Sequence, residues 1–184
     1  MLTFDVDLVA SPPLAAGADG VWLKAGFEPF LTLHLYRRSL VGDQPESGLL
    51  VKQVAPDFDR LIPLDRASFN PLWRMDPTGL RESYRAATRS VVLAVEDGDA
   101  LTGFAIVGVA GITGYLQRIA VDTSARRQGI GSQLVRAGLQ WAQAHGAVTM
   151  LLNTQPENDG SAALYRAEGF ARMPGDLRVL KYEA

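Results

Sequence analysis

The sequence of 184 residues contains no cysteine and only two histidines, His34 and His145, which lie far apart in the chain. The absence of cysteine excludes disulfide bonds, thiolate nucleophiles and cysteine-ligated metal sites. Two distant imidazoles disfavour a zinc site and a histidine-based catalytic triad. We therefore expect no metal cofactor and no enzyme intermediate carried on sulfur.

Long apolar runs and an excess of charge of one sign are also missing. The longest apolar stretch, residues 105–112, is far shorter than the ~20 residues of a membrane span, and the first residues carry no basic segment typical of a secretory signal. Eighteen basic residues against twenty acidic ones give a net charge of −2, too little to hold nucleic acid through a positive field. With 47% hydrophobic residues, the composition predicts a soluble, cytoplasmic globular protein that binds neither membrane nor nucleic acid.

The first part of the chain shows the spacing of a strand, a helix and a second strand. Apolar and polar residues alternate at 4–8 and 31–36, and a helix is expected over 14–25, ending at Gly26. The segment 42–48 is rich in turn-forming residues and marks a boundary. We therefore divide the chain into an N-terminal extension, residues 1–45, and a main domain, residues 46–184.

The main domain is predicted to be α/β. Strands are expected at residues 49–54, 91–96, 101–110, 115–121, 148–152 and 177–182. Helices are expected at 57–69, 78–87 and 159–167, and another from residue 130 to an end at His145-Gly146. The connections include a hairpin at Asp97-Gly98-Asp99 and crossovers through helices. This combination predicts a mixed sheet covered by helices.

The most informative segment runs from Ile119 to Ser132, where a strand passes through a turn with glycines into a helix. Glycines let backbone N–H groups approach an anion, and a helix N-terminus adds about half a positive charge, as in a phosphate-binding cradle. A Walker loop is excluded because no Gly-Lys-Ser/Thr follows. A dinucleotide fingerprint is disfavoured because Leu134 stands at its third glycine. Alone, glycines at the start of a helix more often serve packing than ligand binding.

A second pattern follows the predicted strand 148–152: Asn158, Leu164, Tyr165, Gly169 and Phe170. Together the two patterns resemble the motifs of the GNAT superfamily of N-acetyltransferases. Its Arg/Gln-x-x-Gly-x-Gly/Ala loop is matched by Arg126, Gly129 and Gly131, and its Asn-x-x-Ala-x-x-Leu-Tyr-x-x-x-Gly-Phe pattern departs only at Ser161. The resemblance covers the chain from residue 49 onward and is similar in its second half to the ribosomal-protein N-terminal acetyltransferases.

The resemblance implies a GNAT fold: a mixed, mostly antiparallel central sheet with flanking helices, in which the parallel strands 115–121 and 148–152 splay apart. It implies acetyl-CoA as co-substrate, with its pyrophosphate on the amides of residues 126–132 and its pantetheine arm between the splayed strands. The expected cofactor-binding residues are Ile119, Ala120, Val121, Arg126, Arg127, Gln128, Gly129, Ile130, Gly131, Ser132, Asn158 and Tyr165.

The same resemblance implies catalytic roles for two groups. Tyr165 is the expected general acid that protonates the departing CoA thiolate, and the backbone amide of Ile119 is the expected oxyanion donor. Alternatives remain open: Tyr165 as a core aromatic residue, Asn158 as a helix N-cap, and Arg126 with Arg127 as a solvated surface pair.

A general base is not evident. The two positions where members of the family carry a glutamate hold Tyr115 and Asn153 here. Glu96, Asp122 or Glu157 could substitute through water, or the amine could arrive neutral. The acceptor, an amine of a small molecule or peptide, is expected to meet the loop of residues 69–76.

The N-terminal extension echoes the end of the main domain, because Trp22 to Phe27 has the same spacing as Tyr165 to Phe170. Ala15 and Trp22 stand where Asn158 and Tyr165 would be, so this copy is expected to bind no acetyl-CoA. We interpret it as a degenerate remnant of a tandem acetyltransferase of the mycothiol synthase type. It would extend the sheet, wall the acceptor cleft or mediate a homodimer.

These observations predict an acetyl-CoA-dependent N-acetyltransferase that transfers the acetyl group directly to a primary amine. The alternative is a non-catalytic acyl-CoA-binding sensor or regulatory protein of the same fold, which the two missing glutamates would explain. A nucleic-acid-binding module built on the many arginines is disfavoured by the net charge of −2.

Overall fold

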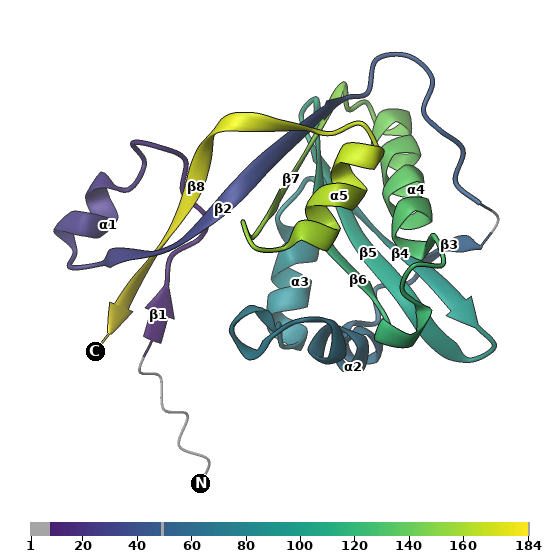
Figure 1. Ribbon diagram of the computed structural model, residues 1–184, viewed down its shortest axis with the longest axis horizontal. Helices are drawn as coiled ribbons and strands as arrows, with labels where there is room; N and C mark the ends of the chain where they lie inside the picture. The colour runs from purple at the N-terminus through teal and green to yellow at the C-terminus, as the bar shows by residue number, and fades with distance from the viewer. Residues whose placement is uncertain (1–7, 49, 184) are drawn as a thin grey trace, which may run out of the picture. The chain divides into compact units, whose positions relative to one another are not determined.

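The structure, a computed structural model, describes residues 8–48 and 50–183, and the chain forms two units (Figure 1). Unit 1 comprises Met1–Arg37, Asn153–Arg166 and Phe170–Ala184, and unit 2 comprises Arg38–Leu152 and Ala167–Gly169. Among the described residues, no helix has the length and apolar character that a membrane crossing requires.

Unit 2 is built on strands in the order β7-β6-β5-β4-β3. Neighbouring strands are antiparallel except for β6 and β7, which are parallel. The strands are β3 (Val51–Val54), β4 (Arg89–Asp97), β5 (Ala100–Ala110), β6 (Thr113–Val121) and β7 (Thr149–Thr154). The predicted mixed, mostly antiparallel sheet is confirmed.

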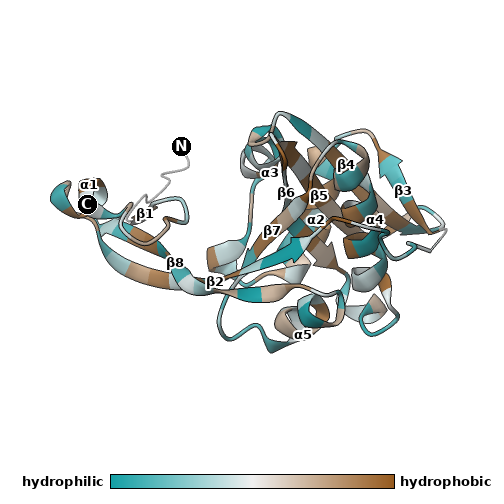
Figure 2. Cartoon of the chain, turned by 90° about the horizontal axis from the view of Figure 1, so that it is seen from above, coloured by the Kyte–Doolittle hydropathy of each residue, from teal (hydrophilic) through white to brown (hydrophobic). Residues whose placement is uncertain are grey.

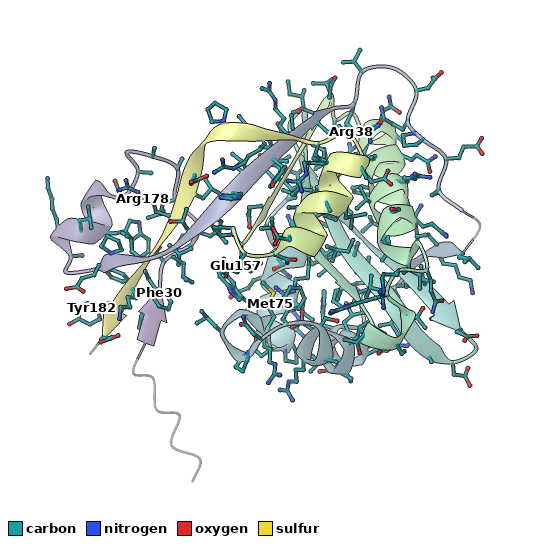
Figure 3. All side chains as sticks on the ribbon, viewed as in Figure 1. Phe30, Arg38, Met75, Glu157, Arg178 and Tyr182 are labelled. Carbon is teal, nitrogen blue, oxygen red and sulfur yellow. The ribbon has the colours of Figure 1, made fainter. Side chains whose placement is uncertain are left out.

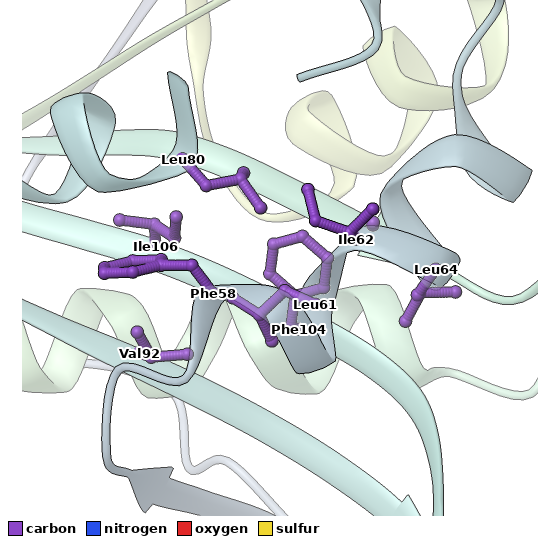
Figure 4. Close-up of a cluster of buried hydrophobic side chains, with 9 residues drawn as sticks. Phe58, Leu61, Ile62, Leu64, Leu80, Val92, Phe104 and Ile106 are labelled. Carbon is purple, nitrogen blue, oxygen red and sulfur yellow. The ribbon is translucent and has the colours of Figure 1, made fainter. Parts of the chain in front are cut away.

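Helices cover both faces of this sheet. On one face, α2 (Phe58–Ser68) and α3 (Pro77–Arg85) enclose a core formed with β4, β5 and β6 (Figure 4). Both helices begin as their sequences predict, because the carboxylates of Asp57 and Asp76 cap the first turns. The core side chains are Phe58, Leu61, Ile62, Leu64, Leu80, Val92, Phe104, Ile106 and Ala120.

The other face is covered by α4 (Ile130–Ala144). Its apolar residues recur at helical spacing, and Ile130, Leu134, Leu139 and Trp141 are all buried. The strands between the two helical layers are correspondingly rich in hydrophobic residues (Figure 2). The helix ends at His145, as the sequence predicts.

Unit 1 contains three antiparallel strands in the order β1-β8-β2, with two helices. The strands are β1 (Leu8–Ala10), β2 (Glu28–Ser39) and β8 (Ala171–Glu183), and the helices are α1 (Gly20–Lys24) and α5 (Asp159–Ala167). The two helices end in the same way. Phe27 N donates to Trp22 O at 3.0 Å, and Phe170 N donates to Tyr165 O at 2.9 Å.

The predicted helix over residues 14–25 is wrong in its first half. Only Gly20–Lys24 is helical, because Leu14 forms an isolated bridge with Arg178 on β8, with hydrogen bonds of 2.8 and 2.9 Å. Gly17, with φ of 86°, turns the chain between this bridge and the helix. Sequence spacing cannot reveal a bridge to a residue so distant in the chain.

Other differences concern element ends. The predicted strand at residues 4–8 lies outside the described residues except for Leu8, and so does Leu49, the expected start of β3. Two short 3-10 helices, η1 (Pro71–Trp73) and η2 (Thr123–Ala125), were expected as loop. The strands β2 and β8 are longer than predicted because they pair with each other over most of their length. The predicted domain division at residue 45 stays a prediction.

Candidate functional site

The parallel strands β6 and β7 separate soon after they pair. Their register runs only from Thr113 with Thr149 to Tyr115 with Leu151, whereas β6 continues to Val121 beside β5. From Leu116 onward, the edge of β6 on the β7 side has no backbone partner in β7 among the described residues. The predicted splay of these strands is confirmed.

A β-bulge accounts for the separation. Ile106 on β5 pairs with Arg118, but the next residue, Val107, pairs with Leu116, so Gln117 is the extra residue on β6. A bulge bends its strand and increases the local twist. The bend at Gln117 therefore turns the second half of β6 away from the direction of β7.

The backbone groups of β6 alternate between β5 and the open edge. The amide of Asp122 donates to Thr102 O on the β5 side at 2.9 Å. Because successive residues of a strand direct their N–H and C=O groups to opposite sides, those of Ile119 and Val121 face the open edge. Consistently, Val121 O accepts a hydrogen bond from Ser68 Oγ at 3.3 Å, and not from β5.

This alternation separates the predicted ligand residues. Ile119 presents its N–H to the open edge, as the predicted oxyanion donor requires. Ala120 instead turns its N–H toward β5 and buries its side chain in the core under α2 and α3. The predicted contact of Ala120 with acetyl-CoA therefore finds no support in the geometry.

The turn from β6 into α4 has an unusual backbone. Arg127, with φ of 63°, is the one non-glycine residue of positive φ among the described residues, and Gly129 follows with φ of 82°. Ahead of them, Asp122 Oδ1 holds η2 by accepting from Ser124 N at 2.8 Å. Left-handed residues in a turn aim consecutive amides into one concave surface, which is an anion-binding arrangement.

The N-terminus of α4 completes this surface. Gly129 is its N-cap and supplies no side chain, so the first-turn amides of Ile130, Gly131 and Ser132 have neither intrahelical acceptors nor a side-chain cap. A Cβ on Gly129 would meet only Gln133 Nε2, at 4.0 Å, so the space over the turn is open. Free donors beside open space fit a pyrophosphate.

Three exposed side chains border the cradle. Arg126 and Arg127 project into solvent and form no ion pair within the described part of the chain. Gln128 is held by a bond from its Nε2 to Ser124 O at 3.3 Å. The two guanidinium groups remain available to an anion, which favours the phosphate-binding interpretation over a surface ion pair.

In unit 1, Tyr165 is only 4% exposed. Its ring lies 6.0 Å from that of Tyr36 and 6.1 Å from that of Phe170. Burial raises the pKa of Tyr165 to about 12, although a hydrogen bond with Ser161 acts in the opposite direction. The phenol is therefore protonated at every physiological pH.

Asn158 caps α5. Its Oδ1 accepts from Ser161 N at 3.1 Å, and its backbone oxygen accepts from Ala162 N at 3.0 Å. This is the N-cap arrangement that the sequence left as the alternative role. Its contact with pantetheine stays a prediction.

Two of the three substitute bases are unsuited to the role. The bond from Arg60 at 2.7 Å, with Lys52 nearby at 3.5 Å, lowers the pKa of Glu96, and the bond from Ser124 lowers the pKa of Asp122. A carboxylate with a lowered pKa is a weaker base. Glu157, exposed on the segment ahead of α5 (Figure 3), stays a candidate.

A buried ion pair in unit 2 was not predicted from the sequence. Arg118 Nη2 lies 2.6 Å from Asp65 Oδ2, and the two side chains are 8% and 0% exposed. One signal was present: Arg118 occupies a position on β6 where the alternation with Leu116 and Ala120 predicts an inward-facing apolar residue.

Comparison with known proteins gives a consistent family. The model of the Acetyltransferase (GNAT) family matches residues 58–170. The chain is 35% identical over 97 residues to aminoglycoside N(6')-acetyltransferase type 1 of Klebsiella aerogenes, over 48% of this chain and 63% of that protein. It is 29% identical over 153 residues to mycothiol acetyltransferase of Renibacterium salmoninarum, over 79% of this chain and 43% of that protein. The chain thus spans less than two thirds of these relatives.

Solved structures show the same fold. A putative acetyltransferase of the GNAT family from Novosphingobium aromaticivorans superposes with a TM-score of 0.69 at 16% identity, over 96% of this chain and 74% of that chain. The ribosomal-protein-S18-alanine N-acetyltransferase from Escherichia coli superposes with a TM-score of 0.60 at 18% identity, over 72% of this chain and 92% of that chain. Because the family match spans both motifs and most of the sheet of unit 2, this chain belongs to the Acetyltransferase (GNAT) family.

Proposed function

We propose that the protein is an acetyl-CoA-dependent N-acetyltransferase that transfers the acetyl group directly to a primary amine of a small molecule or peptide. The observation that carries this proposal is the open edge of β6 at Ile119 and Val121, which leads directly into the cradle at the start of α4. Relatives named for acetyl transfer to aminoglycosides and to a ribosomal-protein alanine support an amine as acceptor.

The cradle would hold the pyrophosphate of acetyl-CoA. The amides of residues 126–132 supply donors, and Arg126 and Arg127 supply positive charge from the rim. The open edge of β6 offers backbone groups to the amides of the pantetheine arm, in the manner of an added strand. Bound acetyl-CoA supplies an activated acyl group as its thioester.

The backbone of Ile119 would act on the thioester carbonyl. Its N–H points to the open edge, where a fixed donor stabilises the negative charge that develops on a carbonyl oxygen under attack. A backbone donor needs no particular side chain, so substitution of Ile119 leaves this function in place. The role of Arg126, which would act through its exposed side chain, can be tested by substitution more readily.

Tyr165 would act on the sulfur as a hydrogen-bond donor more than as a proton donor. A pKa of about 12 lies well above the ~8.5 of an ordinary thiol, so full transfer from the phenol to a thiolate is uphill by roughly 5 kcal/mol. A hydrogen bond from the protonated phenol still stabilises the departing thiolate. This refines the general-acid role that the family resemblance implies.

The amine would arrive in its neutral form. An alkyl amine of pKa near 10.4 is neutral at pH 7 at a cost of about 4.6 kcal/mol. The lowered pKa of Glu96 and of Asp122 leaves neither suited to take up its proton. We therefore propose that bulk solvent deprotonates the amine before it binds, or that Glu157 does so through water.

A non-catalytic acyl-CoA sensor is the second candidate. It is favoured by one observation, that Tyr115 and Asn153 occupy the positions of the family's glutamates. It predicts stabilisation by acetyl-CoA without turnover of any amine. The homodimer and the cytoplasmic location also stay predictions.

The role of residues 1–45 as a degenerate repeat is a further part of the proposal. The matching ends of α1 and α5, with a Phe amide bonded to the aromatic residue five positions earlier, support a shared origin. Trp22 replaces the phenol of Tyr165 in this copy. Isothermal titration should therefore give one acetyl-CoA per chain, and a second equivalent would contradict the proposal.

Melting of the purified protein with acetyl-CoA, free CoA and ATP tests the cofactor assignment. A ligand at 100 times its Kd adds about 2.7 kcal/mol to the native state. Gly129→Glu places a carboxylate over the cradle and should abolish the shift. Because Gly129 has a φ of 82°, Gly129→Ala is the matched control for backbone strain, and it should keep most of the shift.

The outcomes separate the candidates. A shift with acetyl-CoA in the wild type, lost in Gly129→Glu and kept in Gly129→Ala, supports the cradle, and an amine screen then distinguishes enzyme from sensor. Equal shifts with ATP would indicate a general phosphate site. The absence of any shift would contradict the proposed function.

A further inference from the structure

The buried ion pair of unit 2 joins a strand to a helix. Arg118 lies on β6, on the face covered by α2 and α3, and Asp65 lies on α2. Arg118 Nε donates to Asp65 Oδ2 at 2.7 Å, and Arg118 Nη2 lies 2.6 Å from the same oxygen. Neither side chain has appreciable contact with solvent.

Both partners also hold the loop between α2 and α3. Arg118 Nη2 donates to Trp73 O at 2.7 Å, and Asp65 Oδ1 accepts from Met75 N at 2.9 Å. The guanidinium carbon lies 3.5 Å from the centroid of the Phe69 ring, a close cation-π contact. The pair therefore fixes the loop at its start, at its middle and at its end, where Met75 lies (Figure 3).

Stability alone does not account for this arrangement. Removing two charges from water is costly, and apolar side chains of similar volume often stabilise a core equally well or better. What apolar side chains cannot do is bond to Trp73 O and Met75 N. The ion pair thus makes directional hydrogen bonds to the backbone of the loop, and these bonds set the conformation of the loop.

Arg118 also immediately precedes Ile119. Its side chain holds the loop on the face of the sheet, while the N–H of Ile119 points from the same strand segment to the open edge. A shift of the loop relative to β6 would therefore require the Arg118 side chain to move.

We infer that Arg118 and Asp65 are positioning residues that hold the Phe69–Met75 loop in one conformation for the amine acceptor. This rests on the proposed function, in which that loop meets the acceptor. The pair acts through the loop backbone and does not itself touch the reacting atoms. Its loss should weaken acceptor binding and leave acetyl-CoA binding unchanged.

The test uses the double variant Asp65→Leu/Arg118→Met in the full chain, because removing one partner alone leaves a buried charge that endangers folding. Arg60→Met is the matched control, since Arg60 is also on α2 and ion-paired, but with Glu96 at the surface. Hydrogen exchange of the Met75 amide reports directly on the bond to Asp65. Arg118→Lys keeps the charge but lacks the planar fork that spans Asp65 and Trp73.

In the double variant, exchange at Met75 and tryptic cleavage after the exposed Arg74 should be about tenfold faster, while Arg60→Met matches the wild type. The KM for the amine should rise about tenfold with kcat changed far less, and the melting shift with acetyl-CoA should persist. Arg118→Lys should give a Met75 exchange rate and a KM between those of the wild type and those of the double variant.

Three results would overturn the inference. Unchanged Met75 exchange would show that the pair does not hold the loop. Faster exchange with an unchanged KM would show that the held loop does not serve the acceptor. Loss of the acetyl-CoA shift in the double variant would place the effect at the cofactor. Failure of the proposed function itself is distinct, because the wild type would then show no acetyl-CoA shift or no turnover, while Met75 exchange still decides whether the pair holds the loop.

Discussion

The rings of Tyr36 and Tyr165 lie 6.0 Å apart with their planes at 55°, and both side chains are almost fully buried. Tyr36 comes from β2 and Tyr165 from α5, so the N-terminal part of the chain helps to enclose the phenol of the second motif. Enclosure keeps water from the Tyr165 hydroxyl, which is the principal cause of its raised pKa. The extension thus influences the chemistry of a residue far away in the sequence.

The first prediction concerns stability at high pH. In the native state the pKa of Tyr165 is about 12, against 10.0 in the unfolded chain, so between these values only the unfolded chain releases the proton. Stability is therefore full below pH 10 and falls as pH rises toward 12. When the pH is raised from 8 to 11, the free energy of unfolding in urea should fall for both proteins. The fall should be smaller for Tyr165→Phe than for the wild type by about 1 kcal/mol. Tyr182→Phe, at the 41% exposed Tyr182, should behave as wild type.

The second prediction concerns turnover by the same variant. Phenylalanine keeps the ring that packs against Tyr36 and Phe170 but removes the hydroxyl, so folding and the acetyl-CoA melting shift should be retained. Steady-state assays should show kcat lowered by about 10 to 100-fold, because the departing thiolate loses a donor. An unchanged kcat would assign Tyr165 to the core and leave the departing thiolate without a donor from this residue.

The third prediction is a pH profile. If solvent deprotonates the amine, kcat/KM should rise about tenfold per pH unit from pH 6 until the pKa of the amine is approached. The phenol of Tyr165 adds no descending limb below pH 10, because its pKa is about 12. A plateau beginning near pH 7 would instead indicate a base within the protein, and Glu157→Gln would then be expected to remove that plateau.

A fourth prediction tests the packing at the bulge. A Cβ on Gly108 would lie 2.5 Å from Ala87 Cβ and 2.9 Å from Gln117 Nε2, distances that a fold cannot accept without movement. Gly108→Ala should destabilise the protein by about 1–3 kcal/mol in thermal or urea unfolding. Gly160→Ala is the control, because a Cβ there meets nothing within 4 Å, and alanine favours the helix. Equal stabilities would show that Ala87, just before β4, and the bulge adapt freely.

The fifth prediction concerns the acceptor. In unit 2, Asp65 is ion-paired with Arg118 and Glu96 with Arg60. The carboxylate of Asp76 accepts a hydrogen bond from Gly79 N. The exposed loop residues Asn70, Pro71, Leu72 and Arg74 include no carboxylate, and Leu72 is 48% exposed. We therefore expect kcat/KM for an aromatic monoamine to exceed that for a polycationic aminoglycoside by at least about tenfold. The reverse order would show that acidic groups beyond this loop select the acceptor.

Local signals made much of the fold predictable. α4 and α5 begin and end where their spacing and flanking residues predict, and the cap of α2 at Asp57 is visible in the sequence. The cradle could be located because a strand, a glycine turn and a helix are adjacent in the chain. Each of these features depends on residues within a few positions of one another.

Features that depend on distant partners were not predictable. The false helix at residues 14–19 is displaced by pairing of Leu14 with Arg178, and the Asp65–Arg118 pair joins residues 53 positions apart. Asn158 shows a further limit, because one side chain type serves both as a helix cap and as a ligand donor. Spacing identified the residue but could not choose between the two roles.

The left-handed backbone at Arg127 has an entropic consequence for ligand binding. A non-glycine residue in this region carries conformational strain, of order 1 kcal/mol or more. This cost is already included in the free energy of folding. A phosphate group that reaches the turn therefore finds its donors preorganised and has no chain to order. Replacing Arg127 by glycine would relieve that strain but add freedom to the unfolded chain, and it would leave a looser turn that the ligand itself must order.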